Sequence, residues 1–236
     1  MCADLTVMLL GKTGHGKSST GNSILGEEVF DVSDSSQSYT KVVRRGTNRI
    51  DCRQISVIDT PGLYDTHDFD PTTEISKTTE YIRVGFNMSL HNRVDAFLLV
   101  LPYGTRHTNE EAAAVRALER TSLDRKLWDR CIVVFTSGSD FLLFRRKFRR
   151  PITFMDWCMN QGGSLGELLQ RVEYRCLLFE NLRSTDIQER EQRQNLFREV
   201  DYIRRHCGTF TKSDFEKVIN KSKSFFSRIK SACTIL

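Results

Sequence analysis

Five short apolar runs recur along the chain before residue 183, and each is five or six residues long. Continuous apolarity, without the alternation of a half-exposed strand, is typical of strands covered on both faces in a mostly parallel sheet. The predicted strands are LTVMLL (5–10), ISVID (55–59), AFLLVL (96–101), CIVVF (131–135) and YRCLLF (174–179).

Windows of helical periodicity lie between these runs. One opens at Lys17, one spans TNEEAAAVRALERT (108–121), and one lies near SLGELLQRV (164–172). Alternating strands and helices predict an α/β doubly wound fold with helices on both faces of the sheet. At one edge, TKVVRRGT (40–47) and CRQISVI (52–58) predict an antiparallel hairpin.

Beyond residue 183 the pattern is helical, and we expect no further strand. LFREVDYIRRHC (196–207) and FEKVINKSKSFFSRI (215–229) each place apolar residues on one helical face. We therefore predict a sheet domain over residues 1–205 and an amphipathic, basic helical extension over 206–236. A chain of 236 residues is long enough to bury one sizeable core of this kind.

Composition excludes several classes of protein. The net charge of +5 is too small by itself to indicate nucleic acid, and no nucleic-acid-reading module is present, so we expect no such partner. The seven cysteines form no CxxC pair or metal-binding spacing, which favours reduced thiols in the cytosol. No run reaches the roughly 20 apolar residues of a membrane-spanning helix, and the N-terminus lacks the basic region of a signal peptide.

A glycine-rich motif follows the first predicted strand. Residues 11–18, GKTGHGKS, match GxxxxGK[ST] between a strand and a helix, the context that a phosphate-binding loop requires. Its backbone N–H groups would surround phosphates, Lys17 would neutralise the β- and γ-oxygens, and the Ser18 hydroxyl would ligate Mg²⁺. The predicted phosphate-binding residues are Gly11, Lys12, Thr13, Gly14, His15, Gly16, Lys17, Ser18 and Ser19.

A second motif, DTPG (59–62), follows the strand ISVI. A carboxylate at a strand end beside the phosphates would hold Mg²⁺ through water, so Asp59 is a predicted metal residue. The N–H of Gly62 would contact the γ-phosphate. Between the two motifs, Thr40 is the hydroxyl that we expect to close over Mg²⁺ and the γ-phosphate, although a solvated serine-rich loop is the other reading of this segment.

The fourth predicted strand is followed by TSGSD (136–140), where a GTPase carries its guanine-reading element. We place Ser137 and Asp140 at the base, with the Asp140 carboxylate accepting hydrogen bonds from guanine N1 and N2. An ordinary helix cap is the alternative for Asp140. Gly138 stands where the usual lysine would cover the base, so another contact must compensate, and Asn181 after the fifth strand is placed to supply it.

The segments LLGKTGHGKSSTGNSILG, VIDTPGLYD, FLLVLPYGTRHTNEE and VVFTSGSD together resemble the GIMAP/IAN family of immunity-associated GTPases. These have an AIG-type G domain in the septin- and chloroplast-import-receptor-like branch of P-loop GTPases, and the likeness spans about residues 4–205. It implies binding of GTP or GDP with Mg²⁺, slow hydrolysis in the monomer, and GTP-dependent homodimers or oligomers across the nucleotide face. Paralogous members are further partners, and roles in lymphocyte survival or innate defence at intracellular membranes are implied. The stretch SDFLLFRRKFRRPITF (139–154) departs from the family's acidic, glycine-containing pattern.

Two residues bear on hydrolysis. Leu63 occupies the position where Ras-like enzymes carry the glutamine that orients water, so we expect slow monomer turnover. The segment LPYGTRHTNEE (101–111) resembles an additional motif of that family, between DTPG and the base-reading element. Arg106 within it could reach across a dimer and stabilise transition-state charge, which makes it and Lys17 the catalytic candidates. A solvated residue at a helix start is an equal reading of Arg106. His107 and Glu110 are weaker candidates.

The chain ends CTIL (233–236), which fits the C-a-a-X prenylation pattern at Cys233. Basic residues precede it, and a prenyl chain with a basic patch is the two-signal arrangement that stable anchoring needs. We therefore expect location in the cytoplasm, at the cytosolic face of an intracellular membrane. The run RRKFRR (145–150) is a second basic segment, readable as a contact for membrane phosphates or a partner, or as a solvated loop.

The sequence thus predicts a GTP-binding switch and scaffold with weak or dimer-stimulated GTPase activity. One alternative is a P-loop nucleotide hydrolase with significant monomer turnover. The other is a nucleotide-independent membrane adaptor.

Overall fold

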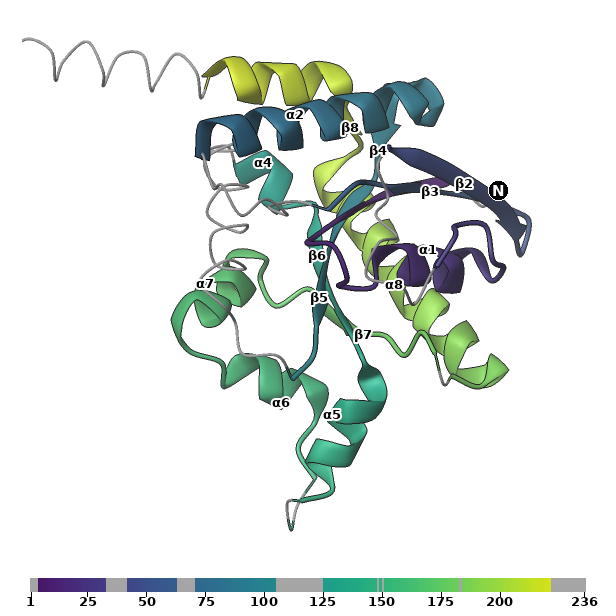
Figure 1. Ribbon diagram of the computed structural model, residues 1–236, viewed down its shortest axis with the longest axis vertical. Helices are drawn as coiled ribbons and strands as arrows, with labels where there is room; N and C mark the ends of the chain where they lie inside the picture. The colour runs from purple at the N-terminus through teal and green to yellow at the C-terminus, as the bar shows by residue number, and fades with distance from the viewer. Residues whose placement is uncertain are drawn as a thin grey trace, which may run out of the picture.

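Six strands form the central sheet of the protein, in the order β2-β3-β1-β5-β6-β7 (Figure 1). The structure is a computed structural model that describes residues 4–32, 42–62, 71–104, 125–147, 149, 151–182 and 184–221. The strands of this sheet are β1 (Leu5–Leu10), β2 (Arg44–Ile50), β3 (Arg53–Asp59), β5 (Ala96–Pro102), β6 (Cys131–Thr136) and β7 (Cys176–Leu178).

The sheet is parallel except at one edge. β1 pairs in parallel with β3 and β5, and β6 pairs in parallel with β5 and β7. β2 is antiparallel to β3, which confirms the predicted edge hairpin and the mostly parallel sheet. Because parallel strands end at one edge, the segments after β1, β3, β6 and β7 are brought together there.

Helices cover both faces of the sheet. On one face lie α1 and α8, and on the other lie α2 and the segment 212–221 (Figure 1). The described helices are α1 (Lys17–Leu25), α2 (Pro71–Met88), the 3₁₀ turn η1 (Leu90–Asn92), α4 (Arg125–Trp128), α5 (Gly138–Arg145), α6 (Phe154–Met159), α7 (Gly163–Arg171) and α8 (Asp186–Cys207).

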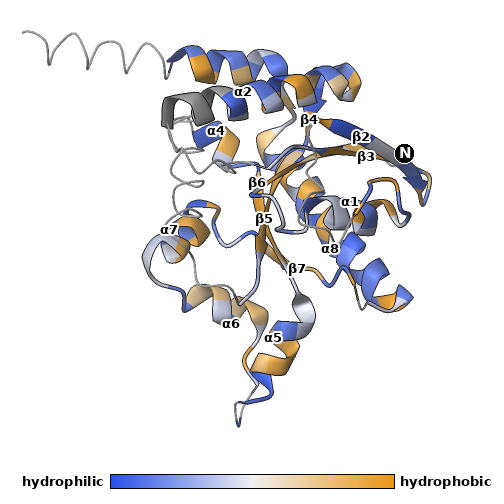
Figure 2. Ribbon diagram, in the orientation of Figure 1, coloured by the Kyte–Doolittle hydropathy of each residue, from blue (hydrophilic) through white to orange (hydrophobic). Residues whose placement is uncertain are grey.

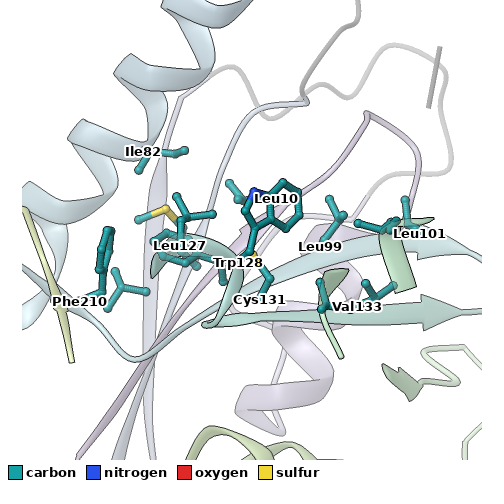
Figure 3. Close-up of a cluster of buried hydrophobic side chains, with 14 of the residues drawn as sticks. Leu10, Ile82, Leu99, Leu101, Leu127, Trp128, Cys131, Val133 and Phe210 are labelled. Atoms are coloured by element: carbon teal, nitrogen blue, oxygen red, sulfur yellow. The ribbon is translucent and has the colours of Figure 1, made fainter. Parts of the chain in front are cut away.

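The apolar run of β1 serves two separate cores, since alternate side chains of a strand point to opposite faces. Val7 and Leu9 join the cluster that includes Val200 of α8, whereas Met8 joins the cluster that includes Phe86 of α2. Figure 3 shows part of the second cluster, which the following residues line: Leu99 and Leu101 of β5, Val133 of β6, Ile82 of α2 and Phe210. Continuous apolarity therefore marks a strand buried on both sides, as predicted.

The C-terminal part corrects one expectation. We expected no strand beyond residue 183, but a two-residue strand, β8 (Phe210–Thr211), pairs with β4 (Arg93–Val94). Residues 212–221 are then helical, and Phe215 lies 5.6 Å from Phe86 between ring centroids. A strand of two residues is too short to show the alternation of apolar and polar positions from which a strand is predicted. The predicted division between residues 205 and 206 falls inside α8.

Charged contacts fix α8 to the sheet. Arg204 pairs with Asp95, which is fully buried and also accepts a hydrogen bond from the backbone N–H of Thr6. Arg53 of β3 forms a bidentate pair with Asp201. Among the helices of the described residues, none is both long and apolar enough to cross a membrane.

Candidate functional site

The loop between β1 and α1 has the backbone conformation of a phosphate-binding loop. Gly14 and Gly16 have positive φ of 81° and 86°, and Gly16 is the N-cap of α1. At Gly11, an added Cβ would lie 2.6 Å from the carbonyl oxygen of Val100, so only glycine fits. The Lys17 side chain is buried and its Nζ donates to the carbonyl of Lys12 at 3.0 Å. These features hold the loop curved around the first turn of α1, where backbone N–H groups favour anions.

Two of the predicted metal residues are in direct contact. The Ser18 hydroxyl donates to Oδ2 of Asp59 at 2.7 Å, and the Asp59 side chain is 1% exposed. The register of β1 and β3 pairs Leu9 with Asp59, and Thr60 donates from its hydroxyl to the Leu9 carbonyl at 2.7 Å. The Ser18 hydroxyl and the Asp59 carboxylate therefore place two oxygen atoms beside the loop, and oxygen atoms are the ligands that Mg²⁺ prefers. The residues present therefore fit a magnesium ion.

On the base side, the start of α5 packs closely on the end of β7. Ser137 is the N-cap with φ of 62°, and the N–H of Gly138 donates to the Phe179 carbonyl at 3.0 Å. A Cβ added at Gly138 would lie 3.3 Å from that carbonyl oxygen, tighter than ordinary van der Waals contact. The glycine that replaces the usual lysine is thus suited to a close backbone approach, a reason that the sequence pattern did not reveal.

Glu180 is a residue of this region that our sequence reasoning missed. Its carboxylate accepts hydrogen bonds from the N–H groups of Ser139 at 2.8 Å and Leu182 at 3.0 Å. It therefore links the first turn of α5 to the loop after β7. A glutamate next to the predicted Asn181 was the available signal, but its partner lies 41 residues earlier.

Asn181 lies against α1. Its amide Nδ2 donates to Thr20 at 2.9 Å, and its Oδ1 accepts from Ser23 at 2.9 Å. The loops also meet through Thr136, whose hydroxyl donates to the His15 carbonyl at 3.3 Å. The predicted phosphate and base elements are therefore brought to one edge of the sheet, with Asn181 fixed to the helix that follows the phosphate-binding loop.

Asp140 is exposed in the first turn of α5, and its backbone N–H donates to the Ser137 carbonyl. Burial, and after it the negative charge of Asp140, raises the pKa of Tyr103 above its ordinary value. Tyr103 packs on Phe141 with ring centroids 5.4 Å apart. Asp140 is therefore open to solvent and accessible to a ligand. Its negative charge acts on Tyr103, the residue that follows β5.

Gly62 lies within the described residues, three positions after Asp59. Six other predicted functional residues lie outside them and remain predictions from sequence. They are Thr40, Leu63, Arg106, His107, Glu110 and Cys233.

The strand order, the glycine loop and the Ser18–Asp59 contact define the fold of a P-loop GTPase G domain. Two solved structures share this fold at low sequence identity. One is Toc33 from Arabidopsis thaliana in complex with Mg²⁺ and GMPPNP, with a TM-score of 0.61, 19% identity, and coverage of 89% of this chain and 88% of that one. The other bears the description "Dimerization is important for the GTPase activity of chloroplast translocon components atToc33 and psToc159", with a TM-score of 0.59, 19% identity, and coverage of 86% and 83%.

The chain belongs to the AIG1 family, whose model matches residues 5–230. Among curated relatives, immune-associated nucleotide-binding protein 12 of Arabidopsis thaliana is 32% identical over 223 residues. That alignment covers 94% of this chain and 53% of the relative, so the chain spans about half the length of that protein. The family resemblance drawn from the four sequence motifs is confirmed.

Proposed function

We propose that this protein is a guanine-nucleotide switch that binds GTP and GDP with Mg²⁺. The observation that carries the proposal is the contact of Ser18 with buried Asp59, beside the phosphate-binding loop between β1 and α1. Ser18 and Asp59 would hold the ion, with Thr40 predicted to join them, and bound Mg²⁺ would neutralise charge on the phosphate oxygens. Lys17 would exchange its contact with the Lys12 carbonyl for the phosphates. The Toc33 structure described with Mg²⁺ and GMPPNP supports this reading.

Guanine preference rests on the base side. The exposed Asp140 carboxylate is a suitable acceptor for the N1 and N2 groups of guanine, which adenine does not present in the same pattern. Affinities for GTP, GDP and ATP, measured by calorimetry with Mg²⁺ and with excess chelator, test both parts of the proposal. Equal affinity for ATP and GTP would remove the guanine assignment, and the absence of any nucleotide binding would favour the adaptor alternative.

Hydrolysis by the monomer should be slow, and association of two copies should accelerate it. Leu63 cannot hydrogen-bond a water molecule as glutamine does, so the isolated chain would leave the attacking water unaligned. An arginine supplied by a second copy can stabilise transition-state charge by a factor of about 10³–10⁵, and Arg106 is the candidate. The solved structure whose description links dimerisation to GTPase activity supports this assembly.

Turnover per molecule, measured over a range of protein concentrations, separates the switch from the fast-hydrolase alternative. If the protein is a switch, the GTPase rate per molecule should rise with protein concentration and should be lower in Arg106→Ala. Arg116→Ala, from the same sequence segment, is the control and should keep the parent rate. A high rate that is independent of concentration would support a hydrolase active as a monomer. An unchanged rate in Arg106→Ala at high concentration would remove that residue from catalysis.

Membrane attachment is the last part of the proposal, with a scaffold role at the cytosolic face. Prenylation of Cys233 would add one anchor, and the basic residues before it would add attraction to anionic lipid. An immune or cell-survival role is supported by the name of the immune-associated relative. Mass spectrometry of the protein from eukaryotic cells tests the anchor, because an unmodified CTIL terminus would contradict it.

A further inference from the structure

The described residues of the basic run 145–150, which the nucleotide site does not use, lie at one end of the molecule (Figure 1). α5 and the turn that follows it project at the end opposite α2 and the 212–221 helix (Figure 1). Arg146, Lys147 and Arg149 are exposed there. No ion pair joins these three side chains to any carboxylate of the part of the chain that the structure describes.

Two leucines are exposed on the same helix. Phe141 points into the core beside Phe154, whereas Leu142 is 40% and Leu143 is 58% exposed. Arg146 and Lys147 follow one turn later, so the cationic side chains are helical neighbours of the leucines. Figure 2 shows hydrophobic and hydrophilic residues following one another along α5 and its end. Leu142 lines a pocket with Leu178 of β7 and Gln192 of α8. Burying Phe141 already fixes α5, so the fold gives no reason for the larger exposure of Leu143.

We propose that this surface, Leu142, Leu143, Arg146, Lys147 and Arg149, docks on an anionic membrane. The stretch from 141 to 151 contains no acidic residue, so its charge is complementary to lipid phosphate and serine headgroups. Leucine side chains can enter the acyl boundary while arginine and lysine stems extend back to the headgroups. An acidic protein would satisfy the cations but would leave both leucines in water unless it also carried an apolar groove. The projecting shape of α5 favours insertion into lipid.

This surface is separate from the proposed lipid on Cys233, and the two can be tested apart. The parent protein is the full chain carrying Cys233→Ser, which cannot be prenylated. Its binding to vesicles of phosphatidylcholine with phosphatidylserine is measured by co-sedimentation, with vesicles of pure phosphatidylcholine for comparison. We expect salt-sensitive binding to the anionic vesicles only.

The charge variant combines Arg146→Gln, Lys147→Gln and Arg149→Gln. Each basic side chain contributes roughly fivefold to partition onto an anionic surface, so the triple variant should bind about 100-fold more weakly. The matched control makes the same change at three exposed arginines of α8, by Arg190→Gln, Arg198→Gln and Arg205→Gln. Affinity for GTP should be the same in both variants, which shows that each is folded.

The apolar variant is Leu143→Ser, for which we expect about a tenfold loss of vesicle binding. Its control is Met88→Ser, the last residue of α2, which is 37% exposed. α2 lies at the end of the molecule opposite α5 (Figure 1). If the α5 and α8 triple variants lost vesicle binding equally, net charge alone would explain the binding, and the proposal would be overturned. Absence of vesicle binding in the Cys233→Ser parent would also overturn it, while the prenylated anchor would stand. Binding to soluble polyglutamate but not to vesicles would assign the surface to an acidic protein instead.

Discussion

The phosphate side and the base side of the site are built in different ways. On the phosphate side, eight consecutive residues supply the loop, and one strand register brings Asp59 to Ser18. On the base side, segments after β6 and β7 meet through backbone groups, and Asn181 connects them to α1. A contiguous motif can be recognised by its spacing, whereas an assembled surface depends on how distant segments pack. The two sides should therefore respond differently to substitution.

The largest effect should come from Lys17→Ala. Loss of the buried cation should weaken binding of GTP, GDP and ATP together by about 100-fold or more, since a charge-assisted contact to phosphate is lost and the base is not involved. Calorimetry with each nucleotide measures this, and Arg205→Ala, which removes an exposed cation of α8, is the control. A loss confined to guanine nucleotides would contradict the assignment of Lys17 to the phosphates.

Asp140→Ala should affect guanine nucleotides selectively. Hydrogen bonds to a charged acceptor contribute about 1.5–3 kcal/mol, so GTP affinity should fall by roughly 10- to 100-fold while ATP affinity stays the same. Removing the carboxylate should also lower the pKa of Tyr103 toward its ordinary value, because the Asp140 charge is one cause of its upward shift. Ultraviolet titration of tyrosine provides this second readout. An unchanged preference for GTP over ATP would leave Asp140 as a helix residue only.

Asn181→Ala should combine a structural and a binding effect. It removes the hydrogen bonds to Thr20 and Ser23, so we expect the free energy of unfolding to fall by about 1–2 kcal/mol. Ser23→Ala removes only one of those contacts and is the matched control. If Asn181 also faces the base, GTP affinity should fall more in Asn181→Ala than in Ser23→Ala, and equal affinities would restrict Asn181 to structure.

The smallest effect should follow Gly138→Ala. The added Cβ would lie 3.3 Å from the Phe179 carbonyl and 3.4 Å from the Glu180 nitrogen, so we expect a loss of about 1 kcal/mol in stability. Gly162→Ala is the control, because a Cβ there meets nothing within 4 Å. Gly138→Lys, which restores the usual pattern, should for the same reason fail to tighten GTP binding. Tighter binding in that variant would show that the loop adapts.

Much of the fold could be predicted because the signals are local. Each of the five apolar runs contains or overlaps a strand of the sheet, and the charged hairpin forms its antiparallel edge. β8 was not predictable, since two residues that pair only with β4 have no periodicity of their own. Glu180 was missed because its partner Ser139 lies in another segment, and the interaction is absent from any local pattern.

The sequence by itself determined the six strands of the central sheet, the glycine loop and the aspartate at the end of β3, because each depends on neighbours within a few residues. Glycines set the loop conformation, and continuous apolarity requires burial on both faces. Tertiary structure alone decided that Gly138 lies against Phe179, that Asn181 is held by α1, and that Phe215 packs on Phe86. These contacts join segments that are distant in the chain, and their geometry is set by the packing of the whole sheet and its helices.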